Sequence, residues 1–396
     1  MTSTSGLCPD ELLARVEASG LRGRGGGWFP AGRKWRAVRT EGGEPVVVAN
    51  GAEGEPGSYK DRFAMVRRAD DVVAGLVLAA RAVGAREAYV FLKASFDGPA
   101  ARIEQALASA PLDGLAVEVR RGDDSYVAGE ETAVLEALEG RRPWPRPKPP
   151  LPAGVGFRGR PTLVQNVETL ARVPAAVSDP ETFRRTETTL VTLWGDVRRP
   201  GVFEVALGTP LRRVVEEQGG GTGEGVGLVF PGGPAGPPLG RDELDTALDP
   251  DALRAAGTAL GTAAVLVVGA SACPLAVAAS AAAFFERENC GQCPPCAVGT
   301  ASLRRILDAF EAGGARPRDR GDLADVAGFM AGHGYCAHGR TAAAVVTGLV
   351  RRLEPEIRAH QAAGGCPDPE RRRPDPFAPG SPERTALERA VAEQLG

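Results

Sequence analysis

Four of the seven cysteines have a spacing suited to an iron–sulfur cluster. Cys290, Cys293 and Cys296 form a C-x2-C-x2-C run, and Cys336 follows 40 residues later. Two-residue spacers let successive thiolates converge on one cluster, and a fourth cysteine completes the set that a 4Fe–4S cluster needs. The alternative is a structural zinc site, which favours two separated C-x2-C pairs and fits the triple run less well. We therefore expect these four cysteines to bind a 4Fe–4S cluster.

The other candidate ligands are expected to have minor roles. His333 and His338 flank Cys336 and could act as ligands, but four cysteines make them unnecessary, so we expect them in supporting or surface positions. Cys8, Cys273 and Cys366 are expected to be structural or incidental, with Cys273 in the core because its surroundings are apolar.

A glycine-rich loop is the second candidate site. Gly23, Gly25, Gly26 and Gly27 precede Lys34, and such a loop can present backbone N–H groups to a phosphate. The glycines alone fit a flexible loop equally well. Lys34 favours a site, because the chain has only four lysines, at positions 34, 60, 93 and 148, and its other basic residues are arginines.

Carboxylates gather in two further loops. The second loop carries Glu53 and Glu55, and the third carries Glu130 and Glu131 where a helix is expected to begin. Paired carboxylates at a helix N-terminus are often only a cap. The alternative is that three loops, together with Gln165 and Asn166, converge on a cofactor at one sheet edge.

The elements that must position these residues alternate between strand and helix. Short apolar runs such as Val46-Val47-Val48 predict buried parallel strands, whose ligands bind beyond their carboxyl ends. We expect strands at 44–50, 87–92 and 115–120 and helices at 7–19, 63–84, 99–108 and 129–138.

The rest of the chain predicts further parts. Residues 143–152 contain six prolines and form an extended connector, and 188–269 read as a β-rich module with a hairpin at 190–205. The uncharged stretch 255–285 is broken by glycines, so we expect a buried strand at 264–269 and a helix from Pro274 rather than a membrane span. The chain is then helical to about residue 362, and a mobile tail follows with a short helix at 383–394.

Composition restricts the class of partner and compartment. A net charge of -3 argues against nucleic acid as a partner. The polar first residues lack the apolar core of a signal peptide, so we expect a cytoplasmic, reduced protein.

A series of motifs in this order resembles one known family. They are Gly20-Leu-Arg-Gly-Arg-Gly-Gly with Phe29-Pro30 and Lys34-Trp35, Glu53-Gly-Glu-Pro-Gly57 with Lys60-Asp61-Arg62, Gly129-Glu-Glu-Thr132, Lys148-Pro-Pro, Pro161-Thr with Asn166-Val-Glu-Thr169, and Cys290-Gly-Gln-Cys-Pro-Pro-Cys296. Together they resemble the flavin-bearing, NADH-binding subunit of respiratory complex I and related diaphorase subunits of hydrogenases and formate dehydrogenases. The resemblance covers about residues 10 to 355.

The resemblance implies a fold in three parts followed by the tail. An α/β Rossmann-like domain at 1–187 would bind FMN and NADH, and a β-grasp-like (SLBB-type) module would occupy 188–272. A C-terminal α-helical bundle at 273–362 would carry the 4Fe–4S cluster, and 363–396 would be the mobile tail.

The resemblance also implies the site residues. Residues of the loops would bind FMN, namely Arg24, Gly25, Gly26, Lys34, Asn50, Glu53, Tyr126, Gly129, Glu130, Gln165 and Asn166. The nicotinamide end of NADH would lie near Phe29, Glu55 and Glu131, and the two carboxylates would orient the dihydronicotinamide.

Several positions depart from the family pattern. Ala52 replaces an expected Asp, Gln165 an Asn, and Trp28 a loop Gly; Ala37 and Leu151 replace two aromatic residues that enclose the adenine. Base–aromatic stacking is worth about 1–3 kcal/mol per ring, so NADH binding is expected to be weakened.

The implied activity is that of an NADH dehydrogenase flavoprotein subunit. Electrons would pass from NADH through FMN to the 4Fe–4S cluster, and then to a partner iron–sulfur protein or a quinone-linked complex. The partner would be a thioredoxin-like 2Fe–2S or a ferredoxin-like subunit, and the complex could hold the chain peripherally on the inner face of the membrane. The alternative is an FMN and 4Fe–4S electron-transfer subunit that has lost or changed nucleotide use and takes electrons from a ferredoxin-like partner.

Overall fold

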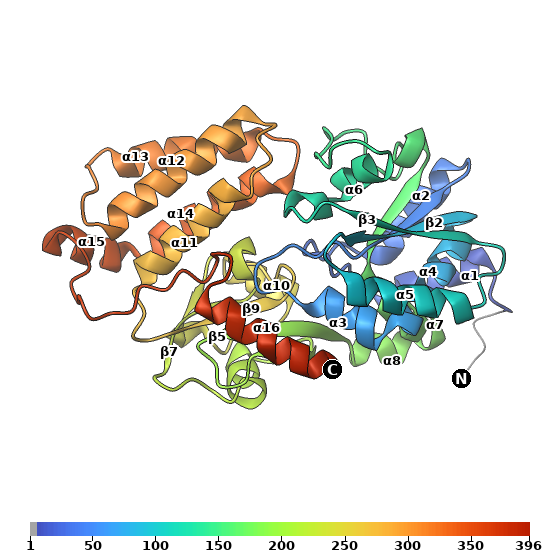
Figure 1. Cartoon of the computed structure of the whole chain (residues 1–396), viewed down its shortest axis with the longest axis horizontal. Helices are drawn as coiled ribbons and strands as arrows, with labels where there is room; N and C mark the ends of the chain where they lie inside the picture. The colour runs from blue at the N-terminus through green and yellow to red at the C-terminus, as the bar shows by residue number, and fades with distance from the viewer. Residues whose placement is uncertain (1–5) are drawn as a thin grey trace. The chain divides into compact units, whose positions relative to one another are not determined.

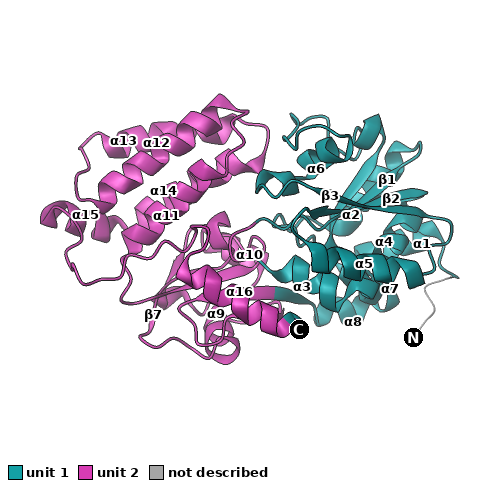
Figure 2. Ribbon diagram, in the orientation of Figure 1, with its two compact units in different colours: residues 1–54, 58–190, 395 teal, residues 55–57, 191–394, 396 magenta. Residues whose placement is uncertain are grey.

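The computed structural model describes residues 6–396 and divides into two compact units (Figure 2). Unit 1 runs to Gly54 and from Ser58 to Leu190, and unit 2 holds Glu55–Gly57 and Val191–Gln394. The predicted boundary at residue 187 lies close to the junction of the units. The boundary predicted at residue 272 falls inside unit 2, where the β-rich and helical parts form one compact body.

Unit 1 is built on a parallel sheet of four strands in the order β3-β2-β1-β4. The strands are β1 (Val46–Asn50), β2 (Glu87–Lys93), β3 (Ala116–Gly122) and β4 (Thr162–Asn166). The sequence predicted the first three. It gave no prediction for β4, whose apolar run is limited to Leu163 and Val164.

Alternate residues of β1 pack into different hydrophobic clusters on the two faces of this sheet. Val47 and Ala49 join the larger cluster with buried residues of α1, α2, α4, α5 and α7. Val46 and Val48 join a smaller cluster that includes Phe157 and Leu135 of α6. Burial on both faces explains why β1 is uniformly apolar rather than alternating.

The helices of unit 1 differ from the expectation in two places (Figure 1). The single helix predicted at 63–84 is two helices, because Arg68 lies between them with φ -134° and ψ 32°. Helix α2 was not predicted. The bounds are α1 Pro9–Ser19, α2 Ala31–Glu41, α3 Lys60–Arg67, α4 Ala69–Val83, α5 Asp97–Ser109, α6 Glu131–Leu138, α7 Val167–Ser178 and α8 Pro180–Arg185, with short 3-10 turns at Val127–Gly129 and Phe157–Gly159.

Unit 2 begins with a mixed sheet in the order β6-β5-β9-β7-β8. Strands β5 (Thr188–Gly195) and β6 (Gly201–Ala206) are consecutive neighbours, as the predicted hairpin requires. β9 (Ala264–Gly269) pairs in parallel with β5 and antiparallel with β7 (Val226–Phe230), and β8 is Leu239–Gly240. Short helical segments lie between them: α9 Leu211–Arg213, a π-helical turn Val214–Gln218, 3-10 turns Gly233–Ala235 and Arg241–Glu243, and α10 Pro250–Ala255.

The second part of unit 2 is helical, as predicted. Its helices are α11 Pro274–Arg287, α12 Pro294–Glu311, α13 Asp319–Gly332, α14 Ala337–Arg352 and α15 Glu354–Ala363. The buried strand β9 and helix α11 occupy the uncharged stretch as expected. Among the described residues, no helix is both long and apolar enough to cross a bilayer.

The segment after residue 363 is packed in this structure, which differs from the mobile tail predicted for it. Phe377 is fully buried and its ring contacts Trp194, Phe230 and Phe284. Helix α16 (Pro382–Leu395) buries Leu387 and Val391. The many prolines and arginines of this segment suggested disorder, whereas a few large apolar side chains anchor it.

Gly75 of α4 gives a first test of unit 1. A Cβ at this position would lie 1.9 Å from the carbonyl oxygen of Leu170 in α7, so the two helices cross where only glycine fits. We expect Gly75→Ala to destabilise the protein by at least about 1–3 kcal/mol, because the helices must separate. Urea unfolding followed by tryptophan fluorescence measures this effect.

The matched control is Gly98→Ala in α5, where a Cβ would meet nothing within 4 Å. This variant should be neutral or more stable by up to about 1 kcal/mol. Equal urea midpoints for Gly75→Ala and the wild type would contradict the close crossing.

Candidate flavin site and metal centre

The carboxyl ends of β1 and β4 bring together the polar residues predicted at the sheet edge. Asn50 and Asn166 are direct partners in the parallel register of these strands. The Asn166 side-chain oxygen caps α7 by accepting the backbone N–H groups of Glu168 and Thr169. Gln165 is buried and accepts a hydrogen bond from Trp35 Nε1 at 3.2 Å.

The glycine-rich loop closes on itself and lies against the end of β4. Gly23 N–H donates to the Phe29 carbonyl at 2.8 Å, and Gly26 takes a φ of +101° that favours glycine. A Cβ on Gly25 would lie 3.5 Å from the Asn166 Cβ. The loop tip is therefore next to the end of the strand.

The second and third loops meet the same strand ends. Asn50 Nδ2 donates to the carbonyl oxygen of Gly129 at 2.9 Å. A Cβ on Gly129 would lie 2.5 Å from the Ala52 carbonyl oxygen, so the close approach of the two loops requires glycine there. A Cβ on Gly54 would likewise meet the Tyr126 backbone at 3.3 Å. The predicted convergence of three loops is present in unit 1.

A network of buried charges lies beneath these loops. Glu168 of α7 is 1% exposed, and its carboxylate accepts hydrogen bonds from Leu190 N–H at 2.9 Å and Arg172 Nε at 3.1 Å. Lys60 Nζ lies 3.3 Å and Arg24 Nε 3.9 Å from the same carboxylate. Burial disfavours ionisation of Glu168, but Lys60, Arg172 and Arg24 outweigh burial and lower its pKa to about 2.

Arg24 belongs to this network through its side chain. Its guanidinium is fully buried, pairs with Glu187 at 2.5 Å and lies 4.3 Å from the centre of the Trp28 ring. Its backbone N–H donates to Thr169 Oγ1 at 2.8 Å. The side chain predicted to contact FMN is thus used within the protein, where it fixes the base of the glycine loop.

Glu53 is also used within the protein. Its carboxylate accepts hydrogen bonds from Ser58 Oγ at 2.5 Å, Asp61 N–H at 3.1 Å and Arg62 Nε at 3.0 Å. Burial opposes ionisation, but Arg62 and Lys60 overcome it and lower the pKa of Glu53. These contacts fold the second loop against α3. Asp61 continues to the strand end by accepting Asn166 Nδ2 at 2.8 Å.

The adjacent carboxylates of the third loop have different surroundings. Glu130 caps α6 by accepting the N–H groups of Thr132 and Ala133, so the capping interpretation holds for it. Glu131 is held by Lys34 at 2.9 Å and Lys148 at 2.8 Å. Burial raises the pKa of Glu131, but the two lysines reverse this effect and lower it to about 2. Lys148 also pairs with Glu130 at 2.6 Å.

The residues predicted near NADH are only partly collected. The Phe29 side chain is 51% exposed, and Ala37 and Leu151, which replace family aromatic residues, are exposed as well. Glu55 belongs to unit 2 and the remaining predicted residues of this group belong to unit 1.

The residues present in unit 1 fit a flavin mononucleotide. Its phosphate needs close backbone approach and positive charge, which the Gly25–Gly27 tip and Lys34 can supply, because a Cβ on Gly27 would meet nothing within 4 Å. The flavin ring needs donors and acceptors at its polar edge. Asn50, Asn166 and Gln165 carry amides at the strand ends where ligands of parallel sheets bind.

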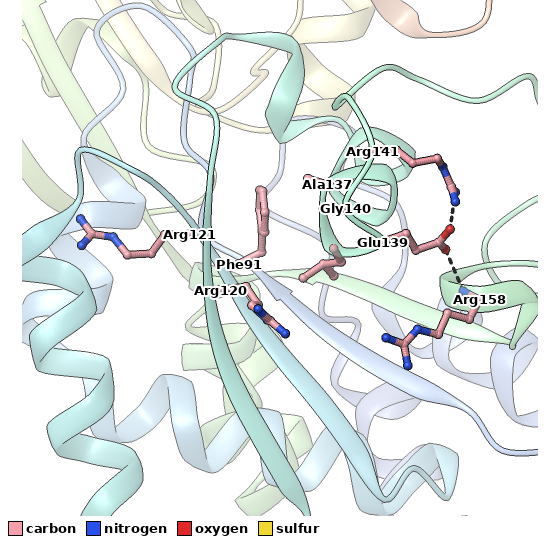
Figure 3. A pocket seen from close by; sticks show the side chains of 9 residues that line it. Phe91, Arg120, Arg121, Ala137, Glu139, Gly140, Arg141 and Arg158 are labelled. Carbon is pink, nitrogen blue, oxygen red and sulfur yellow. Dashed lines mark hydrogen bonds and ion pairs between the residues drawn. The ribbon is translucent and has the colours of Figure 1, made fainter.

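A separate hollow of unit 1, of about 480 Å³, contains none of the predicted site residues. Figure 3 shows that it is lined by arginines, among them Arg120, Arg141 and Arg158. Glu139 pairs with Arg141 and accepts the Arg158 N–H at 2.7 Å, so part of this positive charge is already balanced. We assign no ligand to it.

The four predicted cluster cysteines lie around the first turns of two helices in unit 2. Cys293 caps α12, Cys296 is in the first turn of α12, and Cys336 caps α14. A Cβ on Gly339 would lie 3.4 Å from Cys296 Sγ, so the first turn of α14 approaches that sulfur. Burial, together with Cys336, Cys290 and Cys293 nearby, raises the pKa of Cys296 to about 12.

This donor set fits a 4Fe–4S cluster. Four thiols that raise one another's pKa release their protons to a cationic metal core, and helix N-termini stabilise the negative charge of the product. The histidines do not join them. His338 Nε2 bonds the Phe285 carbonyl oxygen at 2.8 Å, and exposed His333 bonds the Phe329 carbonyl oxygen.

Three family models match the chain in order. Residues 16–175 match the Nuo51 FMN-binding domain, 190–236 the SLBB domain, and 276–360 the NADH-ubiquinone oxidoreductase-F iron-sulfur binding region. The predicted order of an FMN domain, a β-grasp-like SLBB module and a cluster-bearing helical part is confirmed.

Similar proteins cover nearly the whole chain. The second F-type subunit of the NADH-quinone oxidoreductase of Rhizobium meliloti is 38% identical over 91% of this chain and 90% of its own length. The F-type subunit of the Rickettsia bellii NADH-quinone oxidoreductase is 35% identical over 87% of this chain and 89% of its own length. The crystal structure of an NAD+-reducing [NiFe]-hydrogenase in the H2-reduced state superposes with a TM-score of 0.81 at 32% identity, over 91% of this chain and 64% of that one.

The buried network gives a stability prediction. Glu168→Gln leaves Arg24, Lys60 and Arg172 without their shared counter-charge, and removing one partner of a buried pair costs about 3–5 kcal/mol. We expect a loss of this size in the free energy of unfolding and a lower FMN content in the purified protein. Urea unfolding and flavin released per chain measure the two effects.

The matched control is Glu217→Gln, whose partner Arg213 is exposed on the protein surface. This variant should change stability by at most about 0.5 kcal/mol and leave the flavin content unchanged. Equal losses in both variants would remove the special role of the buried carboxylate.

The Glu131 site predicts a pH dependence. Its pKa of about 2 lies below the unfolded value of about 4.3, so ionised Glu131 stabilises the fold at neutral pH. We expect the stabilisation, about 1–3 kcal/mol, to be complete above about pH 4.5 and lost as the pH falls to about 2. Hydrogen exchange of the α6 amides in wild type and Glu131→Gln, compared at each pH, measures it.

The exposed Glu104 of α5 provides the control for this titration. The difference between wild type and Glu104→Gln should stay near zero throughout. A Glu131→Gln difference that persists unchanged below about pH 3 would contradict the role of the two lysines.

Proposed function

The chain belongs to the family of NADH-quinone oxidoreductase F-type subunits, and from this we propose that it oxidises NADH as the FMN- and 4Fe–4S-containing flavoprotein subunit of an electron-transfer complex. The observation that carries the proposal is the conjunction of two sites. One is the convergence of three loops on Asn50 and Asn166, and the other is the set of four cysteines at the first turns of α12 and α14.

The FMN would be held by backbone, ammonium and amide groups. The turn containing Gly25 and Gly26 would hold the phosphate together with Lys34, and Asn50, Gln165 and Asn166 would bond the polar edge of the ring. Gly129 and Tyr126 contribute the adjoining loop surface. Arg24, Glu53 and Glu130 support these groups through the ion pairs and cap that hold their loops in place.

When bound, FMN accepts the two electrons of a hydride together and passes them singly to a 4Fe–4S cluster, which carries one at a time. Glu131 stays ionised at neutral pH, so it can only accept hydrogen bonds there. We assign it to the nicotinamide end of NADH, where an acceptor would orient the carboxamide N–H groups. Glu55 is proposed for the same task.

Recognition of the adenine rests on few rings. Phe29 offers an exposed aromatic face, whereas Ala37 and Leu151 offer none. Since each base–aromatic stack is worth about 1–3 kcal/mol, we propose a weakened affinity for NADH. This observation also favours the second candidate function, an FMN and 4Fe–4S subunit that receives electrons from a ferredoxin-like protein.

The acceptor would be an iron–sulfur subunit of the same complex. One cluster cannot carry electrons over a long path, so a partner with its own centres must follow. We propose a thioredoxin-like 2Fe–2S or ferredoxin-like subunit, which would place the chain peripherally at the inner face of a membrane when the complex is quinone-linked.

Anaerobic stopped-flow mixing with NADH tests the proposal. NADH should bleach the flavin absorbance, and Phe29→Ala should raise the KM for NADH by about 5- to 150-fold, the equivalent of one stacking contact. Ala37→Phe should restore a ring and lower the KM. Both variants should leave the dithionite-bleached flavin amplitude unchanged.

The result that would reject NADH oxidation is an unbleached flavin at millimolar NADH in protein that dithionite still bleaches. Bleaching by a reduced ferredoxin in that same sample would select the second candidate function.

A further inference from the structure

A second group of metal-binding side chains lies in unit 2 and uses none of the four cluster cysteines. The Sγ atoms of Cys273 and Cys366 and a ring nitrogen of His360 all lie within 4.8 Å of one another. Cys273 Sγ is 3.4 Å from His360 Nε2. Cys273 and His360 are fully buried, and Cys366 is half-buried.

The imidazole of His360 is already oriented as a metal ligand. Its Nδ1 lies 2.9 Å from the Glu356 carbonyl oxygen, an acceptor that requires the proton to reside on Nδ1. Nε2 then carries the lone pair and faces the Cys273 sulfur. Metal-binding histidines are commonly fixed in this way, by a carbonyl group on the nitrogen remote from the metal.

Both thiols are held in place by their backbones. Cys273 caps α11, where the N–H groups of Leu275 and Ala276 interact with its sulfur, as suits a thiolate at a helix N-terminus. Cys366 follows the end of α15. The chain after it is fastened beside α11, because Cys273 N–H donates to the Arg372 carbonyl oxygen at 2.8 Å.

We propose that Cys273, His360 and Cys366 bind one Zn²⁺ ion, with water as the fourth ligand. Two thiolates and an imidazole are a donor set that suits zinc, and they balance its charge. In tetrahedral zinc with bonds of about 2.3 Å to sulfur and 2.0 Å to nitrogen, those two ligand atoms are about 3.5 Å apart. The observed separation of 3.4 Å matches this requirement.

The surrounding charges leave the site free for a cation. Arg371, whose charge interacts with both thiols, pairs with Glu356 at 3.0 Å, and Arg373 pairs with Glu311. The ion would join α11, α15 and the segment that follows α15. Because zinc has no redox chemistry, its role would be to fasten this C-terminal segment rather than to carry electrons.

Elemental analysis of the intact, cofactor-loaded protein tests the site. Protein produced with zinc and iron supplied should contain one zinc per chain in addition to the four irons of the cluster. Zinc K-edge X-ray absorption should give two sulfur neighbours at about 2.3 Å and nitrogen or oxygen neighbours at about 2.0 Å. Cys366→Ser and His360→Gln should lose the zinc and keep the iron.

Two further variants separate this site from other thiols. Cys8→Ser, at an exposed cysteine of unit 1, should keep both metals, and Cys336→Ser should lose iron while keeping zinc. If a variant fails to fold, removing zinc from the wild type with a chelator and titrating it back by calorimetry still counts one site.

Three results would overturn the proposal. Wild-type protein could carry no more zinc than Cys366→Ser. The zinc could disappear with Cys336→Ser instead, which would place it among the cluster cysteines. Mass spectrometry of protein purified without air could find Cys273 and Cys366 joined as a disulfide and no zinc.

Discussion

The buried carboxylate of Glu168 holds together the parts of unit 1 that form the flavin site. It binds Lys60 after the second loop, lies beside Arg24 of the glycine loop and accepts the backbone N–H of Leu190. Burying this charge is costly unless each partner is in position, so the loops can take few other arrangements. Lys60 and Asp61 extend the same chain of contacts to Asn166, which lies beside Asn50 at the strand ends. The site is therefore preorganised from below, by groups that need not touch the cofactor.

This constraint explains which features could be predicted from the sequence. Parallel strands with buried faces leave apolar runs, so Val46-Val47-Val48 identified β1, and turn residues located the loops beyond the strands. Strand β4 was missed because only Leu163 and Val164 are apolar within it, although its register with β1 is what pairs Asn50 with Asn166. The division of roles within motifs was also hidden. Arg24 and Glu53 lie among the predicted cofactor residues, yet their side chains bind internal partners, which only the fold brings close.

Trp28 shows how a departure from the family pattern is accommodated. Its φ of 51° lies in the left-handed region, where a bulky side chain is strained and glycine is not. Its ring is 6% exposed and lies against the Arg24 guanidinium, which stabilises a conformation that the backbone alone disfavours. The expectation from sequence placed this ring near the flavin. The structure gives it a position within the loop, where it stiffens the base of the phosphate-binding turn.

The two groups of cysteines in unit 2 differ in how far apart their members lie along the chain. Cys290, Cys293 and Cys296 form a local pattern that sequence reading detects, because two-residue spacers already imply a shared metal. Cys273 and His360 are 87 residues apart, and each alone suggests only a core residue. Their meeting requires that α11, α15 and the following segment pack together, and the buried Phe377 helps to anchor that segment. A segment whose composition suggests disorder therefore gains its order from a few long-range contacts. A zinc ion at Cys273, His360 and Cys366 would add the strongest of them, at a point where prolines and arginines offer little apolar area to bury.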